Sequence, residues 1–131
     1  MSPDRPLPLV GVLAVAALLC NCGSSSPAAN TNTITIANYL FSPSNLSVKA
    51  GATITVVNDD GTQHSVTSQT AFGNFVLGAV SGVQFDTTPF VGTTTFSISA
   101  SAPAGTVVPY FCTVHKGTMG MGQGQITVSA P

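Results

Sequence analysis

Charged residues are scarce in this sequence of 131 residues, which has three lysines and arginines, four aspartates, and neither glutamate nor tryptophan. A chain with a net charge of −1 has no basic surface to hold a nucleic-acid phosphate backbone or anionic lipid headgroups. Its carboxylates after residue 30 are Asp59, Asp60 and Asp86, which leaves few groups for acid–base catalysis. Disorder is a poor explanation, because 44% of the residues are hydrophobic and the net charge is low. We therefore expect a folded protein with no nucleic-acid partner.

The amino-terminal residues 1–22 are predicted to be a signal peptide. Arg5 supplies a positive charge, and the apolar run Leu7–Leu19 is too short to cross a bilayer comfortably. The end of the segment resembles a bacterial lipoprotein signal in which Cys22 carries the lipid, with ordinary cleavage as the alternative. We expect export, to the periplasm or to the cell envelope through a lipid on that cysteine. Residues 23–32 are rich in Ser, Ala, Asn and Thr and are predicted to be a flexible linker.

Residues 33–131 are predicted to form one all-β domain. Hydrophobic residues alternate with polar ones, the period of a half-buried strand, in four segments. These segments are residues 33–37, 53–56, 95–99 and 125–129. Shorter strand candidates are Leu46–Val48, Ser65–Thr67, Phe72–Val76, Val83–Phe85 and Thr106–Phe111. Turn residues separate these segments and no long stretch has a helical period, which indicates an antiparallel sandwich or small barrel of seven to nine strands.

The residues that bind soft metals are gathered in this domain. Two of the three cysteines fall in the signal region, so the domain keeps one, Cys112. An unpaired cysteine in an exported protein needs an explanation, and metal binding is one. The two histidines are His64 and His115, and the two methionines after the initiator are Met119 and Met121. One cysteine, two histidines and a weak thioether are the ligands of a trigonal blue-copper site.

Each of these residues also has an ordinary structural explanation when it is taken alone. A single buried cysteine is common in a β core. His64, in a turn, could lie on the surface, and a methionine beside glycines could fill a gap. The combination favours copper, because the domain places all of its histidine and cysteine where a copper site needs them.

Five segments resemble plastocyanin-like and pseudoazurin-like cupredoxins, in the order in which that family has them. They are Tyr39–Pro43, Val48–Gly51, Val57–Ser65, Tyr110–His115 and Gly124–Val128. The resemblance covers nearly the whole of the predicted domain. It implies an antiparallel Greek-key β-sandwich and an exported bacterial blue copper protein that binds one copper ion.

The resemblance implies that His64, Cys112 and His115 are the equatorial copper ligands. It leaves two candidates for the axial ligand. The spacing after His115 favours Met119, whereas counting back from the last strand, and the family's occasional Met-Gly-Met segment, favour Met121. We take Met121 as the predicted ligand and Met119 as the alternative. A hydrogen-bond acceptor is expected on the outer ring nitrogen of His64.

These ligands predict a carrier that passes single electrons between redox partners in the cell envelope. Delivery of copper in the envelope is the alternative, since it needs the same ligands with more exchangeable metal. Cupredoxin-type enzymes need a further copper cluster, and no histidines are left for one, so we do not expect an enzyme. We expect a monomer that meets its redox partner briefly near His115, and membrane contact only through Cys22.

Overall fold

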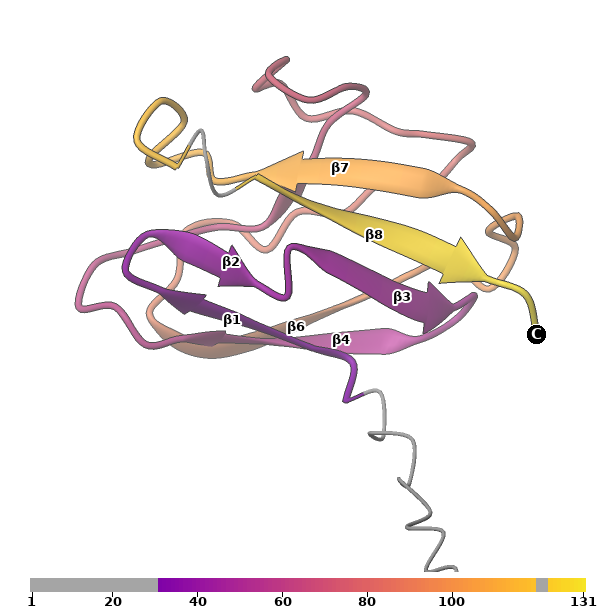
Figure 1. The fold of residues 1–131 in the computed structure, drawn as a ribbon, viewed down its shortest axis with the longest axis horizontal. Coiled ribbons are helices and arrows are strands. Elements are labelled where there is room, and N and C mark those ends of the chain that lie inside the picture. Colours follow the sequence, from indigo (N-terminus) through magenta and orange to yellow (C-terminus); the bar gives the residue numbers. More distant parts are fainter. Residues whose placement is uncertain (1–30, 120–122) are drawn as a thin grey trace, which may run out of the picture.

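The computed structural model describes residues 31–119 and 123–131 (Figure 1). The predicted signal peptide, almost all of the predicted linker, and Met121 lie outside these ranges. No helix among the described residues is long and apolar enough to cross a membrane.

Eight strands form two four-stranded sheets, which confirms the all-β sandwich (Figure 1). The strands are β1 (Thr33–Ala37), β2 (Leu40–Ser42), β3 (Asn45–Lys49), β4 (Thr53–Asn58), β5 (Thr67–Ser68), β6 (Gly92–Ser97), β7 (Val107–Phe111) and β8 (Gly124–Ser129). One sheet has the order β2-β1-β4-β6, and the other has the order β3-β8-β7-β5.

The sheets are mixed, so the prediction of purely antiparallel pairing is wrong at two places. β1 pairs with β4 in parallel, and β3 pairs with β8 in parallel. The reason lies in the route of the chain. β2 turns back from β1, and the chain then passes Pro43 into the other sheet as β3 before β4 turns back again. The two reversals leave β4 running in the direction of β1.

All four predicted strands with clean alternation form, with shifted ends. Of the shorter candidates, residues 46–48 and 106–111 form β3 and β7, and residues 65–67 overlap β5 only at Thr67. Residues 72–76, by contrast, lie in a loop, and of residues 83–85 only Val83 pairs, in an isolated bridge with Val80. β2 was not predicted, because it has only three residues and Pro43 follows it directly. Short strands of this kind depend on a partner across the sheet, which the local sequence does not contain.

The inner faces of the two sheets supply the core. In β1, Ile34 and Ile36 are completely buried, as are Ile54 and Val56 in β4. From the other sheet, Tyr110 and further apolar side chains of β7 and β8 face them. Full burial of such an apolar side chain contributes about 1.5–3 kcal/mol. This packing fixes the ends of β4 and β7, which lie at the same end of the sandwich (Figure 1).

Candidate metal centre

Three segments at this end of the sandwich bring the predicted equatorial ligands together. His64 follows β4 and is held by a backbone bridge, in which its N–H and C=O pair with those of Phe90 at 3.1 and 2.9 Å. Cys112 directly follows β7, and His115 lies three residues further on. The prediction that these residues meet is confirmed, since their ligand atoms all lie within 4.8 Å of one another.

The separations of the ligand atoms suit one metal ion bound by all three residues. The Cys112 Sγ lies 3.7 Å from Nδ1 of His64 and 3.8 Å from Nδ1 of His115. The two Nδ1 atoms are 3.2 Å apart. Bonds of about 2.0–2.1 Å to nitrogen and about 2.3 Å to sulfur, as zinc forms, separate sulfur from nitrogen by about 3.8 Å around a trigonal ion. The residues therefore fit a trigonal site with two imidazoles and one thiolate.

Asp60 accepts a hydrogen bond from the outer ring nitrogen of His64. The sequence analysis predicted an acceptor at this nitrogen without identifying the residue. The His64 Nε2 donates to Asp60 Oδ2 at 2.9 Å, and Thr62 Oγ1 lies 3.3 Å from the same nitrogen. The carboxylate also accepts the backbone N–H groups of Asn38 and Tyr39, at 2.7 and 3.0 Å. A proton held on Nε2 leaves Nδ1 with its lone pair toward the site, which is the tautomer that a metal requires.

The electrostatics of this pair favour the metal-binding forms. The hydrogen bond from the Tyr39 backbone is the main cause that lowers the pKa of the Asp60 carboxyl, despite its partial burial. Burial lowers the pKa of His64, and the hydrogen bond from Asp60 opposes this only in part. The carboxyl is thus ionised and the imidazole neutral near pH 7.

Cys112 is buried and held from the segment that leads into β5. Its sulfur accepts the backbone N–H of Ser65 at 3.4 Å. The Ser65 hydroxyl accepts the backbone N–H of Thr113 at 2.8 Å and lies 2.9 Å from the Thr113 hydroxyl. The Ser65 hydroxyl also lies 3.2 Å from the Thr67 hydroxyl, which donates a hydrogen bond to the Asp86 carboxylate at 2.9 Å. This chain of hydroxyl groups fixes the backbone on both sides of the sulfur.

The loop after Cys112 turns back toward the core. The His115 carbonyl accepts the N–H groups of Thr118 and Met119 at 3.0 and 2.8 Å. Met119 is 1% exposed and belongs to the same buried cluster as Cys112. The predicted axial ligand Met121 lies outside the described residues, so that choice stays a prediction.

Sequence reasoning missed three residues of the site. Asp60 was considered only as one of the few carboxylates and as part of a family segment, although its position four residues before His64 was a usable signal. Ser65 was taken as a strand residue and as part of a family segment, and Tyr39 only as part of a family segment. The ring centroids of Tyr39 and His115 are 4.9 Å apart, and no local pattern in the sequence predicts this contact.

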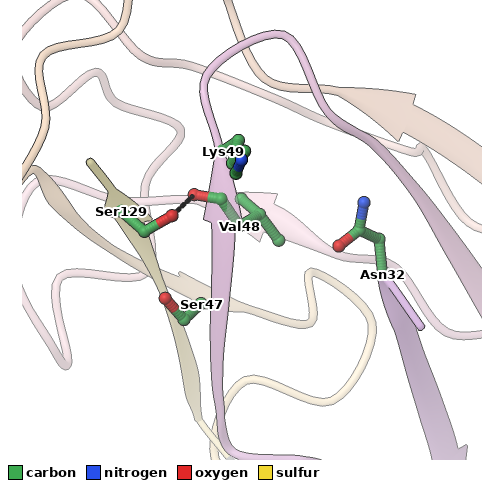
Figure 2. A pocket seen from close by; sticks show the side chains of 5 residues that line it. All are labelled: Asn32, Ser47, Val48, Lys49 and Ser129. Carbon is green, nitrogen blue, oxygen red and sulfur yellow. Dashed lines mark hydrogen bonds between the residues drawn. The ribbon is translucent and has the colours of Figure 1, made fainter. Parts of the chain in front are cut away.

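A hollow beside Lys49 lies away from this centre. Figure 2 shows it lined by Asn32, Ser47, Val48, Lys49 and Ser129. The Ser129 hydroxyl donates to the Val48 carbonyl at 3.2 Å. β3 and β8 end here, at the opposite end of the sandwich from the ends of β4 and β7. Its side chains include no histidine, cysteine or carboxylate, so it offers none of the ligands gathered at the other end.

The structure is a β-sandwich in which His64, Cys112 and His115 are placed so that they could hold one metal ion. The sequence model of the Cupredoxin-like domain matches residues 9–128, and the chain belongs to this family. The predicted family is thereby confirmed. No significant match exists among curated protein sequences.

Solved cupredoxin structures share the fold. The purple cupredoxin from Nitrosopumilus maritimus is 27% identical, with a TM-score of 0.55, over 74% of this chain and 98% of that one. An oxidized mutant of amicyanin is 24% identical, with a TM-score of 0.52, over 79% of this chain and 86% of that one. The copper-containing nitrite reductase from Thermus scotoductus SA-01 is 21% identical, with a TM-score of 0.54, over 76% of this chain but 22% of that one.

Proposed function

We propose that the protein binds one copper ion in a type 1 (blue) site and carries single electrons. The observation that carries this proposal is the convergence of the Cys112 sulfur with the Nδ1 atoms of His64 and His115. A soft thiolate combined with two imidazoles suits copper in both of its oxidation states. Bound copper supplies one-electron oxidation and reduction at this position. The purple cupredoxin of N. maritimus, a relative of similar size, supports the proposal.

The chain's own residues keep the ligands in place through both states. His64 and Cys112 are completely buried, and neighbours hold His64 through Nε2 and Cys112 through its sulfur. Ligands that cannot move need little rearrangement when the charge of the metal changes. Ligating atoms this deeply buried also exchange metal slowly, which favours an electron carrier over the copper-delivery alternative.

The proposal does not include an enzymatic activity. Across residues 31–119 and 123–131, one group of histidine, cysteine and acidic residues has metal-binding geometry. The nitrite reductase resembles this chain over only a small part of its own length. We therefore assign transfer of electrons, with no chemical transformation of a substrate.

For the axial ligand we propose Met119. Its side chain is buried in the cluster that contains Cys112, and its N–H binds the carbonyl of His115. A buried thioether close in sequence to two ligands suits the weak axial contact of a blue-copper site. Met121 is the other candidate, and substitutions distinguish the two.

We propose that a redox protein docks near His115 and that the protein works in the cell envelope. His115 is only half-buried, and its neighbour Val114 is 46% exposed. A small, mostly uncharged contact of this kind suits a brief encounter. Export rests on the amino-terminal pattern of residues 1–22, with Cys22 as the proposed site of lipid attachment.

The test is the visible spectrum of the purified chain after addition of Cu(II). We expect an intense thiolate-to-copper charge-transfer band, which Cys112→Ser abolishes. The matched control is Cys20→Ser with Cys22→Ser, which removes the other two thiols and should leave the band unchanged. Copper bound without colour, or a band that survives Cys112→Ser, would overturn the blue-copper proposal.

A further inference from the structure

The turn between β1 and β2 has an unusual residue at its tightest point. Ala37 pairs with Leu40, so Asn38 and Tyr39 alone form the turn. Both have positive φ, 53° and 62°, as a type I′ hairpin turn requires. Asparagine tolerates this conformation, and the second position strongly prefers glycine. A tyrosine there is strained, because its Cβ crowds the backbone.

A carboxylate of the metal centre holds this strained turn. Asp60 accepts the N–H groups of both turn residues, at 2.7 Å from Asn38 and 3.0 Å from Tyr39. Its Oδ2 also accepts the Nε2 proton of His64 at 2.9 Å. The turn is therefore tied to a metal ligand through one side chain.

The ring of Tyr39 lies against both imidazoles of the centre. Its centroid is 5.2 Å from that of His64 at an interplanar angle of 83°, and 4.9 Å from that of His115 at 84°. These are edge-to-face contacts, a favourable arrangement of aromatic rings. Tyr39 itself is 38% exposed, whereas His64 is completely buried. The ring thus contacts both imidazoles while part of it faces the solvent.

We propose that Tyr39 is a positioning residue of the metal centre, whose ring covers both histidine ligands and retards the loss of the metal. The strained backbone is tolerated because it aims the ring at the imidazoles. This inference rests on the proposed metal binding and adds a residue that controls how long the metal stays. Strain at one residue, held by contacts to a site, is the pattern expected of a functional constraint.

Substitution of Tyr39 distinguishes a role in the metal centre from a role in the fold alone. Glycine adopts positive φ without steric cost, so Tyr39→Gly relieves the strain of the turn. If the tyrosine serves the metal centre, the variant is at least as stable as the wild type without metal, yet loses metal faster. If the tyrosine serves the fold, stability and metal retention fall together.

The experiment follows release of copper from the full chain, loaded with Cu(II), into excess EDTA. Release is measured as protein-bound copper and as the decay of the charge-transfer band. We expect Tyr39→Gly to release copper about tenfold faster, the effect of losing two aromatic contacts. Tyr39→Phe keeps the ring and should release copper within about twofold of the wild-type rate. Urea unfolding of the metal-free chains supplies the stability comparison.

Ser81→Gly is the matched control. Ser81 also has positive φ, 49°, in a separate two-residue turn between Val80 and Val83. Its substitution relieves strain away from the centre and should leave copper release unchanged. Wild-type release from Tyr39→Gly would overturn the proposal, and so would a metal-free Tyr39→Gly chain less stable than the wild type.

The outcomes also separate this inference from the proposed function. If the wild type binds copper without the blue band, only the electron-carrier proposal fails, and the bound-copper measurement still decides the role of Tyr39. If the wild type binds no copper, both proposals fall.

Discussion

Asp60 shows how one side chain can serve several parts of a site. Its two oxygens accept the N–H groups of Asn38 and Tyr39 and the ring proton of His64. Its own N–H donates to the Oδ1 of Asn58 at 3.0 Å, so the carboxylate is anchored as well as charged. A metal-ligating histidine held by a carboxylate keeps its ring orientation and its tautomer. The same residue therefore fixes a ligand and the turn that covers it.

At the same scale, the two methionines are distinguished by their effect on the reduction potential. If Met119 is the axial ligand, Met119→Leu replaces a donor atom with an apolar group. The apolar side chain makes the surroundings of the metal more hydrophobic, which disfavours the more highly charged Cu(II), so the potential should rise by at least about 60 mV, a tenfold change in the equilibrium. Cyclic voltammetry of the copper-loaded chain measures the shift.

The matched control for this prediction is Met121→Leu, which should leave the potential nearly unchanged. The reverse result, with the shift confined to Met121→Leu, would reassign the axial position to the residue that the sequence favoured. Equal and small shifts in both variants would mean that neither thioether approaches the metal.

Among the elements, the pair β7 and β8 depends on one close approach. Tyr110 lies opposite Gly124, and its completely buried ring occupies the space beside that glycine. A Cβ built on Gly124 would lie 2.1 Å from both Cζ and Oη of Tyr110. The tyrosine is packed edge-on against Phe41 at 4.9 Å between centroids, so it has little freedom to move away.

Gly124→Ala should therefore lower the free energy of unfolding by about 3 kcal/mol, as an overpacked core does. Urea unfolding of the metal-free chain measures the change. Gly117→Ala is the control, because a Cβ at that position meets nothing within 4 Å. A Gly124→Ala chain as stable as the control would mean that the β7–β8 pair is packed less tightly than described.

The elements also show what a single sequence can and cannot predict. β1, β4 and β8 are recognisable because period-two alternation records which face of a strand is buried. The proximity of His64, Cys112 and His115 could be predicted, because the domain has so few residues able to bind copper. The partners of Asp60 could not be predicted, since Asn38 and Tyr39 lie 22 and 21 residues away and meet it only across the assembled sheet. The parallel pairs were missed because the chain's passage between sheets leaves no local signal.

At the scale of the whole molecule, the described domain carries few charges, so the dependence of its stability on pH comes from few groups. The pKa of His64 is lowered from 6.5, mainly by burial. The pKa of Asp60 is lowered from 3.8, mainly by the hydrogen bond from the Tyr39 backbone. In both cases the unfolded chain takes up a proton at a higher pH than the folded chain does. Wherever the unfolded state binds more protons than the folded state, stability decreases as the pH is lowered.

The metal-free chain should therefore lose stability in two steps as the pH falls, the first beginning near pH 6.5 from His64 and the second below about pH 4 from Asp60. Each step has a slope of at most about 1.4 kcal/mol per pH unit, the value for one proton. Urea unfolding at a series of pH values measures both steps. Asp60→Asn should reduce the second step and retain the first, because burial of His64 remains. Constant stability between pH 7.5 and about pH 5 would contradict the depressed pKa of His64, and with it the neutral imidazole held ready for the metal.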